Sequence, residues 1–302
     1  MQYFDLHCDT LYKAVTDNRS LNDPSCQVSI DRGRNFSRWT QCMAIWIPDD
    51  LTPKAQMSLF MNAHKCLIAQ SRRHQIPIVI DSSNIRDNEF NLMFTVENGA
   101  FLAGDISNVD LLQKHSVRMM TLTWNGKNCI GGGADAPDLG LTEFGRRCIP
   151  ELEQSSVVID ISHASDRLFN DVANMATKPL VASHSNSRAV CNHRRNITDE
   201  QFQIIKQSGG LVGLNFHRDF LSASPDTASV KDLLLHAEHF LSLGGEDVLC
   251  IGSDFDGSNI PHDLSGIEKI PILWEEFLKI GYTEQLVQKI MYYNAHNFFS
   301  AF

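Results

Sequence analysis

The chain has 302 residues, of which 43% are hydrophobic and 21% are charged, so it is long enough for one large barrel or two ordinary globular domains. Its formal net charge of -10 argues against a nucleic-acid partner, because such a partner requires a basic face. No apolar stretch approaches the roughly 20 residues of a membrane span, and the first residues do not resemble a signal peptide. The eight cysteines show no CxxC spacing, which is typical of scattered thiols in a reducing compartment, and we expect a cytoplasmic protein without a membrane partner.

Short apolar runs alternate along the chain with longer amphipathic stretches, which predicts strands that alternate with helices. Eight strands are expected, in chain order, at Tyr3–Cys8, Cys42–Ile47, Leu92–Val96, Arg118–Thr123, Val157–Ser162, Leu180–Ser183, Leu211–Phe216 and Val248–Ser253. Several of them are near-continuous apolar runs, as in VVIDIS, which is typical of parallel strands covered on both faces. The extra run Ile76–Ile80 is expected to form a peripheral strand.

Helices are expected at Leu51–Ala69, Glu143–Gln154, Asp166–Met175, Asp199–Gln207, Val230–Leu243 and Thr283–His296. Thr198, followed by two acidic residues, has the pattern of a helix start. Alternating strands and helices predict a parallel α/β fold, in which a doubly wound sheet competes with a closed barrel. Eight strands in a chain of this length favour a (β/α)8 TIM barrel of the metal-dependent hydrolase type, formed by residues 1–302 as a single domain.

The Gly-, Asn- and Asp-rich stretch at residues 125–140 is too long for a simple turn between a strand and a helix. Long loops on the C-terminal face of a barrel commonly form the substrate pocket. We therefore expect a substrate loop there.

Acidic residues and histidines occur where the predicted strands end. They are His7 and Asp9 after the first strand, Glu97 after the third, His163 after the fifth, His184 after the sixth and Asp254 after the eighth. On a barrel these strand ends converge on one face, so residues far apart in the sequence can share one site.

His7 and Asp9 are separated by one residue, and alternate residues of a strand point the same way. They can therefore bind one ion while Cys8 faces away from it, although an isolated pair of this kind is more often a coincidence. Asp5, one step deeper on the same face, is expected to be a hydrogen-bonded interior acid.

The carboxylate of Glu97 has two oxygens and can bridge two ions, although an acid at a strand end is more often part of a turn. A single strand-end histidine is more often a core residue than a ligand. His163 and His184 follow two consecutive strands, which makes that interpretation less attractive for the pair. This mixed set of nitrogen and oxygen ligands fits zinc best, with manganese, cobalt or iron as alternatives.

Asp254 and Asp256 occur in the segment GSDFDG, share one face of the predicted strand end and precede Gly257, which permits a sharp turn. Asp254 is nearest the strand end and is expected to act as a general base or proton shuttle beside a metal site. Asp256 is expected to be structural, in an Asx-type turn.

The segments FDLHCDT, TVENG, MMTLTWN, DISHAS, ASHSNSRAVCNHRRN and IGSDFDG occur in this order between Tyr3 and about Phe299. In this combination the chain resembles the membrane (renal-type) dipeptidase family of zinc metallopeptidases, within the amidohydrolase superfamily. The resemblance implies a barrel that binds two Zn2+ ions. The implied ligands are His7 and Asp9 for one ion and His163 and His184 for the other, with Glu97 as the bridge.

The resemblance also implies that Asp254 handles protons during peptide-bond cleavage and that Arg195 holds the substrate carboxylate. A guanidinium can donate two parallel hydrogen bonds to a carboxylate, which suits that role. Without the family, Arg195 would be interpreted as a solvated surface residue.

Two positions depart from the family pattern. Well-studied members carry a substrate-binding histidine at the end of the fourth strand, where this chain has Trp124, followed by Asn125. An indole N–H is a lone donor and cannot replace an imidazole. His217 stands where a tyrosine is familiar, and because it also follows a strand that opens on the same face, it is a candidate to replace the missing imidazole.

We therefore expect a zinc-dependent dipeptidase that cleaves small L,L-dipeptides and L-Xaa-D-Xaa dipeptides, by attack of a hydroxide that bridges the two metal ions. Without a signal peptide or an anchor signal, the chain resembles a soluble bacterial-type member. Trp124 leaves open another small amide as substrate, such as a β-lactam, a cyclic amide or an N-acyl amino acid. A non-catalytic binding protein is the less favoured alternative, because Asp254 and all the ligands are present. Family members are often homodimers, and the sequence has no feature that decides the oligomeric state.

Overall fold

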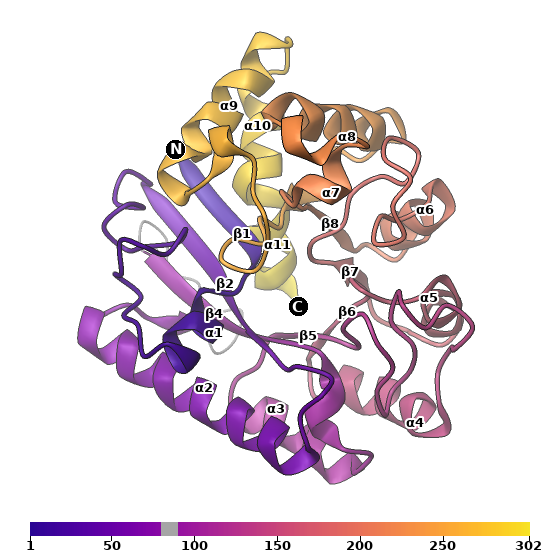
Figure 1. The fold of residues 1–302 in the computed structure, drawn as a ribbon. Helices are drawn as coiled ribbons and strands as arrows, with labels where there is room; N and C mark the ends of the chain where they lie inside the picture. The colour runs from indigo at the N-terminus through magenta and orange to yellow at the C-terminus, as the bar shows by residue number, and fades with distance from the viewer. Residues whose placement is uncertain (80–89) are drawn as a thin grey trace.

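The computed structural model describes residues 1–79 and 90–302, in which parallel strands close into a barrel surrounded by helices (Figure 1). The barrel strands are β1 (Gln2–Cys8), β2 (Arg38–Trp46), β4 (Phe90–Glu97), β5 (Met119–Thr121), β6 (Val158–Asp160), β7 (Leu180–Ala182), β8 (Leu211–Leu214) and β9 (Leu249–Ile251). Each strand pairs in parallel with the next, and the pairing of β9 with β1 closes the ring. The predicted strands and the eight-stranded TIM-barrel fold are thus confirmed, and the doubly wound sheet is excluded.

A short additional strand, β3 (Ile78–Val79), pairs in parallel with β4. This confirms a peripheral strand within the predicted run Ile76–Ile80, whose last residue lies outside the described part of the chain. β3 adds to the sheet beside β4 and does not take part in closing the ring.

Most of the helices lie around the outside of the barrel, whereas α11 (Asn294–Ala301) lies at its middle in this view and packs against apolar side chains inside the barrel (Figure 1). The other helices are α1 (Thr10–Thr16), α2 (Pro53–His74), α3 (Asp110–Lys114), α4 (Glu143–Gln154), α5 (Asp166–Ala173), α6 (Asp199–Gln207), α7 (Arg218–Leu221), α8 (Val230–Ser242), α9 (Ile270–Lys279) and α10 (Glu284–Gln288). The predicted bounds of α4 and α6 are correct. Each of these helices starts directly after a threonine that caps its first turn. Thr142 accepts a hydrogen bond from the Gly145 N–H, and Thr198 forms a capping box with Gln201.

The last predicted helix, Thr283–His296, is not continuous. A π-helical segment at Lys289–Tyr293 separates α10 from α11. Helices α1, α3, α7 and α9 were not expected. With 7 residues, α1 is too short to show a clear helical period in the sequence, and it begins directly after β1.

The end of the barrel opposite the C-terminal ends of the strands is filled by apolar side chains. The inner cluster consists of Phe4, Leu6, Cys42, Val79, Met93, Met119, Val158, Val181, Leu211 and Cys250, together with Tyr292, Ala295 and Phe299 from the C-terminal segment. Phe299 of α11 stacks on Phe4 of β1, with the ring centroids 5.7 Å apart. Because this end of the barrel is packed with apolar groups, polar side chains gather at the C-terminal ends of the strands.

Two buried aspartates join neighbouring strands near their C-terminal ends. Asp5 of β1 accepts hydrogen bonds from the backbone N–H of Ser253 (2.9 Å) and from its hydroxyl (2.6 Å), just after β9. Asp160 of β6 accepts them from the Ser183 N–H after β7 (3.0 Å) and from the Thr121 hydroxyl of β5 (2.6 Å). These contacts fix the positions at which the following residues leave the strands.

The prediction that Asp5 shares a strand face with His7 is wrong, although Asp5 is the buried, hydrogen-bonded acid that was expected. The register between β1 and β2 shifts between Asp5 and Cys8, which marks a bulge. Phe4 and Leu6 point into the barrel, so regular alternation would turn His7 outward. The bulge brings His7 to the inner side instead, while Cys8 packs against Met43 in the outer core.

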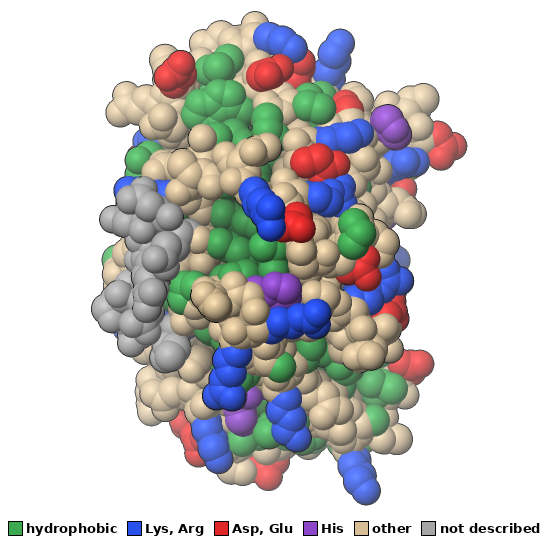
Figure 2. Space-filling model, turned by 90° about the vertical axis from the view of Figure 1, so that its left-hand side faces the viewer, with side chains coloured by type: hydrophobic (Ala, Val, Ile, Leu, Met, Phe, Trp, Pro, Cys, Tyr) green, Lys and Arg blue, Asp and Glu red, His purple; other side chains and the backbone are tan. Residues whose placement is uncertain are grey.

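Within residues 1–79 and 90–302, no helix combines the length and apolar character needed to cross a membrane. On the face that Figure 2 shows, lysine and arginine side chains lie among acidic and neutral ones. A mixed surface of this kind is ordinary for a globular protein.

Asp5→Ala is expected to lower the free energy of unfolding by about 3 kcal/mol, because it leaves the buried N–H groups of Ser253 and His7 without the acceptor that they share. Urea denaturation followed by circular dichroism measures this. The matched control is Asp226→Ala, at an exposed position, which should change stability by less than about 0.5 kcal/mol. Equal stabilities for the two variants would contradict the structural role of Asp5.

Candidate metal centre and pocket

The structure brings the predicted ligand residues together at the C-terminal end of the barrel, where all of them are buried. Their exposed fractions are 2% for His7, 6% for Asp9, 5% for Glu97, 7% for His163 and 1% for His184. His7 and Glu97 come from the ends of β1 and β4, and the other three directly follow strands or the turns after them. The convergence expected of strand ends on a barrel therefore holds for this set.

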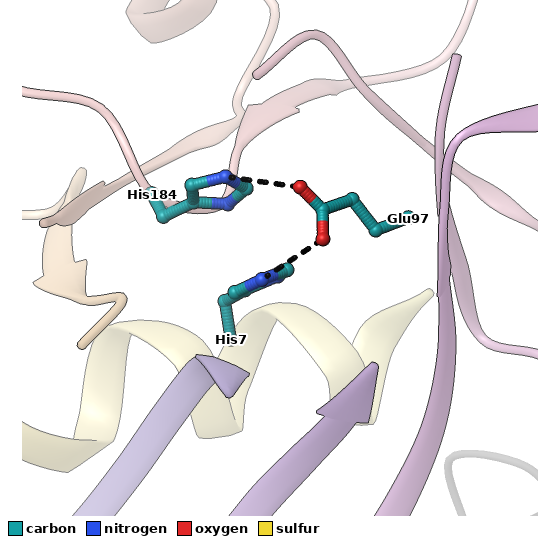
Figure 3. A group of neighbouring side chains, drawn as sticks. All are labelled: His7, Glu97 and His184. Carbon is teal, nitrogen blue, oxygen red and sulfur yellow. Dashed lines mark ion pairs between the residues drawn. The ribbon is translucent and has the colours of Figure 1, made fainter. Parts of the chain in front are cut away.

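Glu97 lies between the histidines, with one carboxylate oxygen toward each side. In Figure 3 the rings of His7 and His184 both point at its carboxylate. Oε2 lies 3.6 Å from Nε2 of His7, whereas Oε1 lies 2.9 Å from Nε2 of His163 and 4.0 Å from Nε2 of His184. This arrangement suits a carboxylate that bridges two cations.

Hydrogen bonds determine which nitrogen each histidine presents to the centre. Nδ1 of His163 contacts Oδ1 of Asn125 at 2.8 Å, and Nδ1 of His184 contacts the Ser183 hydroxyl at 2.7 Å. That hydroxyl donates to Asp160, so it accepts from Nδ1–H of His184. The two Nε2 atoms, 2.9 Å apart, then face each other with lone pairs, which a shared cation site would satisfy.

Two further observations support a metal in this place. Among residues 1–79 and 90–302, Nε2 of His7 and Oδ1 of Asp9 are buried polar atoms without a hydrogen-bond partner. A Cβ atom at Gly257 would lie 2.0 Å from Oδ2 of Asp9 and 2.8 Å from Oδ1 of Asp254. The sequence therefore keeps the space beside these two carboxylates clear.

The charges of the cluster also favour a cation. Burial raises the pKa of Glu97, and the neighbouring carboxylate of Asp9 raises it further. Burial lowers the pKa of His163 and His184, which keeps both rings neutral. Burial also tends to lower the pKa of His7, but Asp9 and Glu97 outweigh it and raise the value to about 10. Crowded carboxylates thus attract positive charge, and a divalent cation can displace the proton from His7.

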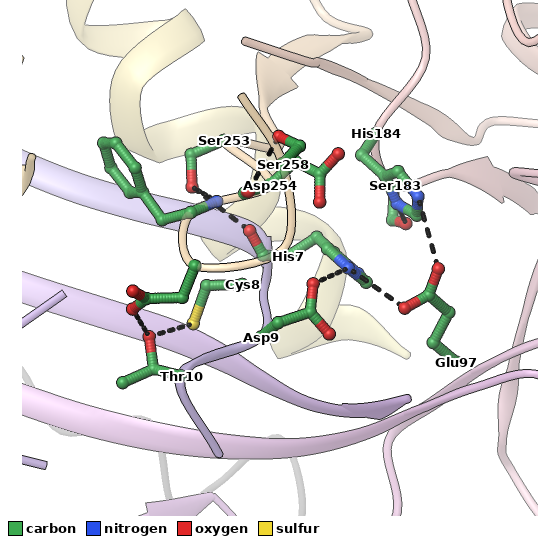
Figure 4. A network of polar contacts seen from close by, with 12 residues as sticks. His7, Cys8, Asp9, Thr10, Glu97, Ser183, His184, Ser253, Asp254 and Ser258 are labelled. Carbon is green, nitrogen blue, oxygen red and sulfur yellow. Dashed lines mark hydrogen bonds and ion pairs between the residues drawn. The ribbon is translucent and has the colours of Figure 1, made fainter. Parts of the chain in front are cut away.

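Asp254 lies next to this cluster (Figure 4). Ligand atoms of His7, Asp9 and Asp254 all lie within 4.8 Å of one another. Oδ2 of Asp254 accepts a hydrogen bond from the Asn215 amide at 3.1 Å, which leaves Oδ1 on the side of Gly257. Its carboxyl pKa is raised by burial.

Asp254 and Asp256 do not share a strand face, because β9 ends at Ile251 and both residues have positive φ angles of 61° and 67°. Asp256 turns away from the cluster and accepts hydrogen bonds from the Thr10 hydroxyl (2.6 Å) and the Gln27 N–H (2.8 Å). Asp256 is therefore structural, as expected, but its carboxylate binds distant segments and does not form the predicted Asx-type turn.

A pocket of about 570 Å³ opens above the cluster, within the size range of small-molecule sites. Arg195 lines it and is only 5% exposed, so its interpretation as a solvated surface residue is wrong. Its guanidinium lies 5.3 Å over the Phe220 ring, and Nε and Nη2 make no hydrogen bond within the described chain. Burial lowers its pKa to about 10, which still leaves it positively charged at neutral pH. A buried cation without an anionic partner is suited to bind a carboxylate.

Trp124 and His217 line the same pocket. The Trp124 ring lies 4.9 Å from that of Trp46 and 6.3 Å from that of His163. The His217 ring meets the Phe220 ring edge-on at 4.5 Å. Both residues therefore stand where a substrate would contact them.

The stretch at residues 125–140, which the structure describes in full, contributes Asn125 to the pocket lining and no other residue. Gly133 pairs with Ala164, and the Ser165 hydroxyl donates to the Leu139 carbonyl. The stretch thus packs on the turn that carries His163, and the expected pocket loop acts mainly as a support for that turn.

Several residues of the site were not singled out from the sequence, or not for the contact they make. They are Ser183 and Asp160 behind His184, Asn125 behind His163, Asn215 behind Asp254, and Tyr12 and Trp46 in the pocket wall. A usable signal was present for Asp160, because it is a charged residue inside the apolar run VVIDIS.

The fold and this cluster define a metal-dependent hydrolase on a TIM barrel. Residues 1–301 match the model of the membrane dipeptidase family, peptidase family M19, and the chain belongs to this family of metallopeptidases.

Solved structures and a curated protein are similar to this chain. The dipeptidase AC, a metallopeptidase of family M19, has a TM-score of 0.92 and 26% identity, covering 98% of this chain and 97% of its own. A metallopeptidase from Rhodobacter sphaeroides, liganded with a phosphinate mimic of the dipeptide L-Ala-D-Ala, has a TM-score of 0.92 and 24% identity, covering 98% of both chains. An uncharacterized protein in the pqqA 5' region of Klebsiella pneumoniae is 32% identical over 218 residues, which are 69% of this chain and 80% of that protein.

Removal of bound metal with a chelator is expected to lower the Tm by on the order of 10 °C, because an ion that binds only the folded state stabilises it.

Gly257→Ala should lower the metal content measured by elemental analysis, since its Cβ would crowd Asp9. Ser258→Ala, in the same turn, should bind metal as the wild type does. Full metal content in Gly257→Ala, or a Tm insensitive to chelation, would argue against a metal centre here.

Proposed function

We propose that this chain is a dipeptidase that hydrolyses the peptide bond of small dipeptides with the help of two divalent cations. The observation that carries this proposal is the buried guanidinium of Arg195, whose Nε and Nη2 have no hydrogen-bond partner within residues 1–79 and 90–302, in the wall of the pocket that contains the ligand cluster. It places a carboxylate-binding group beside a candidate hydrolytic centre. Membership of the M19 family supports the same reaction.

In this proposal His7 and Asp9 would hold one cation, His163 and His184 would hold the other, and Glu97 would serve both. Zinc matches the imidazole and carboxylate donors best, and manganese or cobalt are alternatives. When bound, such cations lower the pKa of a water molecule and polarise the carbonyl of the scissile bond.

Asp254 handles the proton. Because the Asn215 amide occupies Oδ2, Oδ1 can accept a proton from the attacking water and deliver it to the leaving amine. The burial that raises the pKa of Asp254 helps it to hold that proton for part of the cycle.

Arg195 binds the free carboxylate at the C-terminus of the substrate, and because it lines the same pocket as the cluster, the enzyme is restricted to short peptides. Trp124 and His217 contact the substrate from the pocket walls, and the His217 ring meets the Phe220 ring over which the Arg195 guanidinium lies. Substrates include L,L-dipeptides and dipeptides with a D-residue at the C-terminus. The Rhodobacter sphaeroides relative, which was liganded with a mimic of L-Ala-D-Ala, supports the second group.

We also infer that the protein acts in a reducing, cytoplasmic environment. Its eight cysteines all lie in the described residues and form no disulfide. Free thiols in this number are typical of such a compartment.

Wild-type protein reconstituted with zinc should cleave a panel of L,L- and L,D-dipeptides. Asp254→Asn should lower kcat by about a thousandfold with unchanged metal content, because the amide cannot accept the proton. Dipeptide cleavage by Asp254→Asn at the wild-type rate would contradict the role of Asp254. A metal-loaded wild type that cleaves no dipeptide would favour a β-lactam, a cyclic amide or an N-acyl amino acid as substrate, and these should be assayed in parallel.

Arg195→Met should lower kcat/KM for dipeptides by about 30-fold, since a charge-assisted hydrogen bond contributes about 2 kcal/mol. For dipeptide amides, which lack the carboxylate, the same substitution should lower kcat/KM far less. Arg194→Met is the matched control, because the adjacent Arg194 side chain is 62% exposed and pairs with Asp135 at the surface. If dipeptides and dipeptide amides lost the same factor, Arg195 would not be the carboxylate anchor.

A further inference from the structure

We propose that the pocket selects dipeptides whose N-terminal residue has a large apolar side chain. The selecting surface is an aromatic wall formed by Tyr12, Trp46 and Trp124, three of the residues that line the pocket. This inference rests on the dipeptidase function proposed above and adds the side chain that the enzyme prefers.

The aromatic wall is continuous. The Tyr12 ring meets the Trp46 ring edge-on, with centroids 5.1 Å apart, and Trp46 and Trp124 follow at 4.9 Å. Trp124 in turn lies 6.3 Å from the ring of His163. The wall therefore begins beside the ligand cluster and runs outward to α1, and all three aromatic residues remain partly exposed.

Trp46, the middle residue of the aromatic wall, stands across the barrel from the strand that precedes the carboxylate anchor. In the ring β1-β2-β4-β5-β6-β7-β8-β9, strand β7 is four places from β2 in either direction. Trp46 ends β2, and Arg195 lies in the connection between β7 and α6. A substrate held by its C-terminal carboxylate at Arg195, with its peptide bond over the central cluster, directs its N-terminal residue toward the wall.

Two charged groups beside the aromatic wall are already paired. Nζ of Lys13 lies 3.1 Å from Oδ1 of Asp256, and Asp17 pairs with Arg19 at 3.1 Å. An apolar N-terminal side chain buries its surface against the rings, whereas a polar one loses its water there and finds Lys13 and Asp17 already occupied. Loss of apolar surface from water is the dominant favourable contribution in such a subsite.

The test compares kcat/KM for Phe-Ala and Leu-Ala with kcat/KM for Gly-Ala, and includes the reversed peptides Ala-Phe and Ala-Leu. We expect kcat/KM for Phe-Ala and Leu-Ala to exceed kcat/KM for Gly-Ala by at least about tenfold. For the reversed peptides, kcat/KM should not show this gain over Gly-Ala. The ratio of Phe-Ala to Gly-Ala should fall several-fold in Trp46→Ala and less in Trp46→Leu. Because both substrates are measured on one preparation, this ratio is independent of the folded or metal-loaded fraction.

Trp274→Ala is the matched control, since this tryptophan lies on α9 outside the pocket, and it should keep the wild-type ratio. A wild-type ratio near one, or an unchanged ratio in Trp46→Ala, would overturn the selectivity while leaving the dipeptidase function standing. Failure of the metal-loaded wild type to cleave every peptide in the panel, Gly-Ala included, would overturn both.

Discussion

Hydrogen bonds from buried carboxylates to neighbouring strand ends are the interaction on which the site depends. Asp5 holds the end of β9 through Ser253, and Asp160 holds the end of β7 through Ser183. In a barrel the strand ends set the positions of all the groups that follow them, so a shift of one strand would separate the ligand residues. These contacts lie between the apolar end of the barrel and the polar cluster, and they join the two.

The same network fixes the chemistry of the cluster. Asp160, through the Ser183 hydroxyl, sets which nitrogen His184 presents, and Asn125 does the same for His163. His163 itself has a positive φ of 69°, a conformation that costs a non-glycine residue about 1–2 kcal/mol. Such strain persists where the surroundings over-determine the backbone, and here the long connection after β5 packs on that turn.

Much of this could be predicted from the sequence, because it depends on local patterns. Apolar runs marked the barrel strands, the capping threonine at 198 marked the start of α6, and convergence of strand ends assembled the candidate ligands. What could not be predicted depends on pairing between distant segments. The bulge that turns His7 inward is a property of the register between β1 and β2, and the contact of Asn215 with Asp254 follows from β8 and β9 being neighbours.

In the proposed function, the barrel separates the reaction from the choice of substrate. The candidate ligands His163 and His184 are held by hydrogen bonds to Asn125 and Ser183, whereas the aromatic wall adjoins the cluster through the ring of Trp124. The substrate carboxylate would bind at Arg195 and the first side chain against Trp46, whose strand β2 is opposite β7 in the ring. Different parts of the pocket would then set the length of the substrate and the nature of its first residue around one centre.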